Sequence, residues 1–209
     1  RFRLDKMLKL RVSLRKERYD LIYDLQQVGR TNFYFRWLLP DTRWVGGAKG
    51  CRVYNRRPDN RCAADHFKIL LEQAGVPTRH TLDCDIRWFR DDASEILERY
   101  NLKDSPYIVL IPGASQGNDD KRWPRYNELS RYLRSKHWRV ITVPGPFEME
   151  YCRKIDGDML VNNDGSFINF HLLADILRKS TFVVGNDTGP THIAAHSGCR
   201  GVALFNGRI

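Results

Sequence analysis

Apolar and polar residues follow helical spacing over much of the first half of the chain. Helices are predicted over 3–17, 62–74 and 91–101, and a run of apolar residues predicts a strand within 19–25. The stretch 40–60 is rich in glycine, arginine and turn-forming residues, and its weak periodicity predicts no regular element. This half of the chain is therefore expected to mix helices with at least one strand.

Beyond residue 105 short apolar strands alternate with helices. The expected strands are 107–111, 138–143, 159–161, 182–184 and 202–205, and the expected helices begin near 124 or cover 147–155, 167–179 and 190–197. Such alternation predicts an α/β fold, with a parallel sheet covered by helices on both faces and ligands bound at the carboxyl ends of its strands. We expect one domain over 1–104, ending in a linker, and a second over 105–209.

Composition narrows the class of protein. The 209 residues are 42% hydrophobic and 29% charged, which is typical of a folded, soluble chain. No apolar run reaches the roughly 18 residues that a membrane-spanning helix needs, and the first residues do not resemble a signal peptide. Five scattered cysteines without a C-x-x-C pair favour free thiols in a reducing cytoplasm over a disulfide framework or a metal site.

The net charge of +10 lies entirely in the first part of the chain. Residues 1–61 hold 16 Lys and Arg against 6 Asp and Glu, whereas residues 62–209 hold 19 of each. A basic region of this kind attracts phosphates, anionic lipid or nucleic acid, but it is also compatible with an ordinary solvated face. No recognisable nucleic-acid-binding motif is present, so we expect no nucleic-acid partner.

A first candidate site follows the strand predicted at 107–111. The sequence continues I-P-G-A-S, and K-R-W-P follows at 121–124. A glycine after a strand lets backbone N–H groups approach a phosphate, and Ser115 adds a hydroxyl donor. Lys121 and Arg122 lie just before a helix N-terminus, where an anion is favoured. A plain loop explains the same residues, and the pattern leaves both interpretations open.

A second candidate site is the sequence N-D-T-G-P-T-H at 186–192. Asp187 and Thr188 are common N-cap residues and Pro190 suits the first turn, so the motif could simply begin a helix. Alternatively, Asp187 could bind sugar hydroxyls while the amides of Thr188 and Gly189 hold a pyrophosphate. His192 lies one turn into the helix, where a packing or capping role is more common than a catalytic one.

A third candidate is P-G-P-F-E-M-E at 144–150, after another predicted strand. An acidic residue at such a position often accepts both hydroxyls of a ribose, and Glu148 is nearer the turn than Glu150. A first-turn glutamate that interacts only with the helix dipole is the alternative. The aromatic residues of 166–173 could wall a nucleobase, but we expect them in the core.

Taken in order along the chain, these motifs resemble the heptosyltransferases of glycosyltransferase family 9. The resemblance also includes Y-D-L-I-Y-D-L-Q at 19–26 and extends to G-N-D-T-G-P-T-H-I-A-A-H-S-G at 185–198. It implies a GT-B fold of two Rossmann-like domains, the N-terminal one incomplete and the C-terminal one truncated at its end. It also implies inverting transfer of heptose from ADP-heptose to the lipopolysaccharide inner core, without a metal or other cofactor. The enzyme would work in the cytoplasm at the inner face of the inner membrane, where the basic N-terminal part would contact the membrane and an anionic lipid-linked glycan acceptor.

The resemblance also suggests a role for each candidate residue. Lys121 would contact the donor phosphate or the transferred sugar, Asp187 the sugar, and Glu148 the ribose. The pyrophosphate would be held by Ser115, Thr188 and Gly189. Asp187, Lys121 and His192 are the candidate catalytic residues.

The usual general base of the family is not found in this sequence. That residue is an aspartate in a glycine-containing loop after the first strand of the family, and no such loop is present here. Asp24 is no substitute, because it belongs to a buried strand end. We therefore expect this chain alone to be inactive. A related transferase with another sugar or acceptor, an inactive nucleotide-sugar-binding module and a protein that binds polyanions through its basic segment remain as alternatives.

Overall fold

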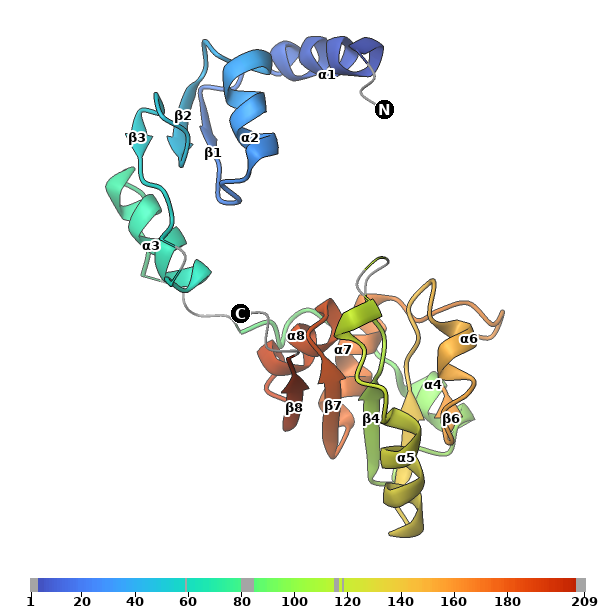
Figure 1. Ribbon diagram of the computed structural model, residues 1–209. Coiled ribbons are helices and arrows are strands. Elements are labelled where there is room, and N and C mark those ends of the chain that lie inside the picture. Colours follow the sequence, from blue (N-terminus) through green and yellow to red (C-terminus); the bar gives the residue numbers. More distant parts are fainter. Residues whose placement is uncertain (1–3, 59, 80–84, 115–116, 118, 206–209) are drawn as a thin grey trace. The chain divides into compact units, whose positions relative to one another are not determined.

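The chain folds into two compact units, Arg1–Asp83 and Cys84–Ile209, which we call the first and second units (Figure 1). The computed structural model describes residues 4–58, 60–79, 85–114, 117 and 119–205. Each unit contains a parallel sheet with helices, so the predicted α/β class is confirmed. No helix in the described ranges is long and apolar enough to cross a bilayer.

The first unit contains a three-stranded parallel sheet in the order β1-β2-β3. The strands are β1 (Leu21–Tyr23), β2 (Arg43–Gly46) and β3 (Val53–Tyr54), and the helices are α1 (Leu4–Lys16), α2 (Gly29–Phe33), the π-helix η1 (Tyr34–Leu38) and α3 (Ala63–Gln73). Leu38, Leu39 and Trp44 form the centre of its core, and the indole N–H of Trp44 donates to the carbonyl oxygen of Leu39 at 3.1 Å.

The prediction of no regular element within 40–60 was wrong, because β2 and β3 lie there. The glycines that suggested turns are required by close packing. A Cβ on Gly46 would lie 2.9 Å from the Cβ of Asp24, and one on Gly47 would lie 2.6 Å from the amide oxygen of Gln27. Glycine here permits the approach of neighbouring chain segments, which the local sequence pattern does not reveal.

A buried polar network fixes the loop after β1. The carboxylate of Asp24 accepts hydrogen bonds from the backbone N–H of Gln27 at 2.9 Å and from the hydroxyl of Thr31 at 2.7 Å. Gln27 has a φ of 53°, and its side-chain amide donates to the carbonyl oxygen of Asn55 and accepts from the N–H of Arg57, each at 2.8 Å. Both carboxylate oxygens of Asp24 therefore have structural partners in this loop.

His66 of α3 completes this network in its neutral form. Its Nε2 lies 2.9 Å from Nε2 of Gln27, and the partners of Gln27 make that nitrogen a donor, so His66 must accept. Burial, together with the charges of Arg61 and Arg57, lowers the pKa of His66. Protonation of this ring is therefore costly in the folded protein.

We expect the first unit to lose stability as the pH falls below about 6.5, the pKa of an unperturbed histidine. A depressed pKa in the folded state means that the unfolded chain takes up the proton first, so stability is full above that pH and declines below it. Hydrogen exchange of the amides of α3 at pH 7.5 and 5.5, corrected for intrinsic rates, measures the effect. His66→Gln should reduce the pH dependence, and His137→Gln, at an exposed position of the second unit, should leave it unchanged. An unaltered dependence in His66→Gln would contradict this explanation.

The second unit is built on a five-stranded parallel sheet in the order β6-β5-β4-β7-β8 (Figure 1). Its strands are β4 (Tyr107–Ile111), β5 (Arg139–Thr142), β6 (Asp158–Met159), β7 (Phe182–Asn186) and β8 (Gly201–Leu204). Its helices are α4 (Ser94–Arg99), the 3-10 helix η2 (Asp119–Lys121), α5 (Tyr126–Ser135), α6 (Met149–Cys152), α7 (Phe170–Lys179) and α8 (Gly189–His196).

Helices cover both faces of this sheet, as the sequence predicts. Side chains of β4 alternate between two cores: Tyr107, Val109 and Ile111 pack with residues of α4, α7 and α8. Ile108 and Leu110 pack on the other face with residues of α5. A strand that is buried on both faces reads as a continuous apolar run, which is why β4 was recognisable from the sequence alone.

The compact units divide at a different point from the domain boundary expected at 104/105. Residues 85–104 belong to the second unit, where Ile96, Leu97 and Leu102 are buried in the same core as β4. The buried carboxylate of Asp175 in α7 also accepts a hydrogen bond from the N–H of Ala93 at 3.1 Å and so anchors the start of α4. The polar segment 101–106 suggests a linker, but Leu102 within it is only 1% exposed.

Candidate active site

The carboxyl ends of three neighbouring strands surround one cavity of about 560 Å³ in the second unit. Its lining comes from the end of β4, the loop between β5 and α6, the start of α7, and the segment that joins β7 to α8. β4 pairs with β5 on one side and with β7 on the other, so the strand order reverses here. Open parallel sheets bind their ligands at such a switch point, and the volume suits a small molecule.

A cluster of three charged or ionisable side chains lies in this cavity. Nζ of Lys121 donates to Oδ2 of Asp187 at 2.7 Å, and Nε2 of His192 lies 3.2 Å from Oδ1 of the same carboxylate. The hydrogen bond from Lys121, helped by the one from His192, holds the pKa of Asp187 below its usual value against the opposing effect of burial. The cavity therefore contains an ionised carboxylate that interacts with a lysine ammonium and a histidine ring. Lys121 and Asp187 are 66 residues apart in the sequence.

The first turn of α8 faces the same cavity through Thr188 and Gly189. Pro190 lies in the first turn, as expected, but the N-cap residue Thr188 makes no side-chain capping hydrogen bond. Its hydroxyl oxygen is buried and has no hydrogen-bond partner among the described residues. The helix start thus explains Pro190, but it does not explain the side chains of Asp187 and Thr188. Together with the free N–H groups of a first helical turn, the Thr188 hydroxyl suits an anionic ligand.

Glu148 lines the cavity from the turn between β5 and α6, whereas Glu150 is exposed and pairs with Arg153 at 3.4 Å. Oε2 of Glu148 accepts a hydrogen bond from the N–H of Gly145 at 2.8 Å. The carboxylate also lies against Gly113, so closely that a Cβ at Gly113 would overlap it. The glycine was expected to admit a phosphate, and in this structure it also makes room for Glu148.

Gly113→Ala should therefore displace the Glu148 carboxylate and weaken nucleotide binding about as much as Glu148→Ala does. Calorimetric titration with ADP measures the effect. The double variant should bind no worse than Glu148→Ala, because the overlap disappears with the carboxylate, and such non-additivity is typical of residues in contact. Additive losses in the double variant would mean that Gly113 acts on the nucleotide directly.

The structure brings together six of the residues selected from the sequence. They are Lys121, Glu148, Asp187, Thr188, Gly189 and His192. Ser115 lies outside the described residues. Arg122 does not line the cavity, and its guanidinium lies over the ring of Tyr151, 5.3 Å from the centroid.

Three residues of this region were not selected from the sequence. Phe170 was expected in the core, but it is 55% exposed and lines the cavity with Phe147, which is 73% exposed. Asn186 does not line the cavity, but it is fully buried and holds the surrounding loops through hydrogen bonds. Its position, a polar residue that ends the apolar strand F-V-V-G-N, was the available signal.

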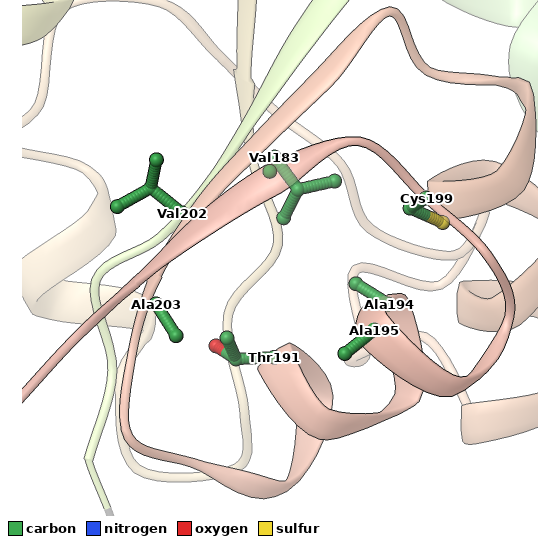
Figure 2. Close-up of a pocket in the computed structure, with 8 residues that line it drawn as sticks. Val183, Thr191, Ala194, Ala195, Cys199, Val202 and Ala203 are labelled. Carbon is green, nitrogen blue, oxygen red and sulfur yellow. The ribbon is translucent and has the colours of Figure 1, made fainter. Parts of the chain in front are cut away.

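A smaller cavity of about 170 Å³ lies between β8 and α8 (Figure 2). Val183, Ala194, Val202 and Ala203 make its lining mainly apolar, and Thr191 contributes a hydroxyl. The residues that line it include no charged side chain, so it does not share the chemistry of the larger cavity.

Solved structures define the fold class of this chain. A glycosyltransferase family 9 structure from Veillonella parvula matches with a TM-score of 0.73 and 21% identity over 99% of this chain and 64% of that one. The E. coli heptosyltransferase WaaC, solved with ADP-2-deoxy-2-fluoro heptose, matches with a TM-score of 0.64 and 17% identity over 98% and 67%. E. coli ADP-heptose LPS heptosyltransferase II matches with a TM-score of 0.61 and 18% identity over 96% of this chain and 67% of that one. The fold is that of GT-B glycosyltransferases, and the chain spans about two thirds of the length of these structures.

The family follows from the sequence as well. Residues 7–207 match glycosyltransferase family 9 (heptosyltransferase), and the chain belongs to this family. No curated protein matches the sequence.

Proposed function

We propose that this chain is part of an enzyme that transfers heptose from ADP-heptose to the lipopolysaccharide inner core with inversion, and that the cavity of the second unit binds the donor. Membership of the family supports a glycosyltransferase. The observation that carries the donor site is the Lys121–Asp187 pair, which lies beside the first turn of α8 in a cavity that also contains Glu148. E. coli WaaC has been solved with an ADP-heptose analogue, which favours the same donor here.

The donor is expected to lie along the cavity with each part beside a matching group. The diphosphate meets Lys121, the hydroxyl of Thr188 and the amides of Thr188 and Gly189, while the ribose hydroxyls meet Glu148. The transferred sugar meets Asp187, which His192 helps to hold in place. Cations and amides that are already positioned stabilise the diphosphate as it departs, in the manner of an oxyanion site. We propose direct displacement, without a metal or other cofactor.

The acceptor side of the proposal rests on charge. The excess of ten positive charges within residues 1–61 suits an acceptor that carries phosphates and acidic sugars on a lipid anchor. The same charge would favour peripheral contact with anionic lipid on the cytoplasmic side of the inner membrane. No nucleic-acid partner is proposed.

Thermal melting with ADP, UDP, GDP and their available sugars tests the donor site. We expect ADP and ADP-heptose to raise the melting temperature, because a ligand that binds only the folded state stabilises it. If none of the nucleotides raises the melting temperature, the proposal is contradicted. A larger stabilisation by UDP or GDP would favour a transferase with a different donor. Donor binding without transfer to any acceptor, in the longest natural chain that contains this sequence, would favour an inactive binding module.

A different sugar or acceptor is the main alternative. Most of the groups just described are assigned to the diphosphate and the ribose, and only Asp187, which His192 helps to hold, is assigned to the sugar. The best-defined part of the site therefore selects for a nucleoside diphosphate more strongly than for heptose.

A further inference from the structure

Asn186 is the last residue of β7 and is fully buried. Its Nδ2 donates to the carbonyl oxygens of Pro112 at 2.9 Å and Gly113 at 3.1 Å. Its Oδ1 accepts from the N–H of Trp123 at 3.2 Å and from the hydroxyl of Tyr126 at 3.1 Å. Two donors and two acceptor positions are all that a side-chain amide offers, so its hydrogen-bonding capacity is fully used.

These four bonds join the segments that carry the candidate donor site. Gly113 leaves room for the carboxylate of Glu148, and Trp123 follows Lys121 by two residues. Asn186 itself directly precedes Asp187. One amide therefore connects the loop after β4, the segment after η2 and the end of β7, although Asn186 does not line the cavity.

Only a primary amide of this length can make all four hydrogen bonds. The orientation of the amide is fixed, because the N–H of Trp123 can only donate and the two carbonyl oxygens can only accept. The substitution Asn186→Asp would set a carboxylate oxygen against those carbonyl groups, and Asn186→Ala would remove all four hydrogen bonds. Asn186 is therefore constrained by the hydrogen bonds that its side chain makes as well as by its size.

We infer that Asn186 is a positioning residue for donor binding. It holds Lys121 and the Gly113 loop in register with Asp187, and so it sets the spacing of the groups that contact the diphosphate and the ribose. This inference rests on the proposed function, because it assumes that the cavity binds a nucleotide.

Calorimetric titration with ADP, on protein shown to be folded at the temperature used, tests the inference. Asn186→Ala and Asn186→Asp should weaken ADP binding by about tenfold or more, whereas Tyr126→Phe, which removes one of the four bonds, should cost about threefold. Tyr107→Phe is the matched control. It removes a buried hydrogen bond of 2.6 Å to the carbonyl oxygen of Ile176 and should lower the melting temperature without changing affinity.

A double-mutant cycle separates positioning from general stability. In a Lys121→Ala background the effect of Asn186→Ala on ADP affinity should shrink, because part of it acts through Lys121. Wild-type affinity in a folded Asn186 variant, or full additivity with Lys121→Ala, would overturn the inference. If the Asn186 variants do not fold, unchanged affinity in Tyr126→Phe would overturn it. Failure of the wild-type protein to bind ADP would overturn the proposed function and this inference with it.

Discussion

Replacing Lys121 with alanine is expected to weaken ADP binding by about 10- to 100-fold. A hydrogen bond to a charged group contributes about 1.5–3 kcal/mol, and each 1.4 kcal/mol corresponds to a factor of ten in affinity. Lys121 is the cation of the cavity that pairs directly with Asp187, at 2.7 Å, and its side chain is 35% exposed, so an incoming diphosphate can reach it. Calorimetry with ADP measures the loss.

The stability of the protein should change little in the same variant. Partly exposed ion pairs contribute about 0–1 kcal/mol, so Lys121→Ala should alter the melting temperature of the ligand-free protein by only a few degrees. Lys136→Ala is the matched control, since it removes the same charge from an exposed position at the end of α5. An equal loss of ADP affinity in both variants would mean that net charge, rather than a contact, attracts the nucleotide.

The sequence identified the correct edge of the sheet because parallel α/β folds obey a simple rule. Strands that run the same way place all their carboxyl ends together, so polar residues that follow separate strands converge. Glu148 and Asp187 were selected for that reason, and Lys121 because it precedes a predicted helix start. The structure places all three around one cavity. The apolar runs of β4 and β7 were long enough to locate those strand ends.

Features that depend on contacts between distant segments could not be predicted. Nothing local shows that Gly113 accommodates Glu148, which lies 35 residues further along the chain. The four partners of Asn186 are likewise 60 to 74 residues away. β3 has two residues, too few for any periodic pattern, and β2 has four. Leu102 was read as part of a linker because its neighbours are polar, although its own side chain is buried.

The Asp187 carboxylate has two opposing effects on a bound donor. In the ligand-free protein it pairs with Lys121, so a diphosphate must compete with it for that cation and is also repelled by it. A sugar that follows the diphosphate can instead donate its hydroxyl groups to this carboxylate. The ligand with a sugar and the ligand without one should therefore respond differently to the loss of the charge.

Asp187→Asn should accordingly tighten the binding of ADP by about fivefold, since relief of a nearby like charge is on the order of 1 kcal/mol. The ratio of the dissociation constants of ADP and ADP-heptose, which measures how much the sugar adds to affinity, should fall at least tenfold relative to the wild type. The charged hydrogen bonds between the carboxylate and the sugar are then replaced by weaker neutral ones. The depressed pKa of Asp187 keeps the wild-type carboxylate ionised from pH 8 to pH 5, so both effects should persist over that range.

The matched control for this experiment is Asp156→Asn, which removes an exposed carboxylate paired with Arg134 at 3.3 Å in the same unit. It should leave both dissociation constants unchanged. If Asp187→Asn instead lowers the melting temperature strongly and leaves the ratio intact, Asp187 serves the start of α8 and the sugar is recognised elsewhere. A rise in ADP affinity together with a strong fall in the ratio would assign the carboxylate to the sugar. A residue that only stabilises the start of a helix would affect ADP and ADP-heptose alike.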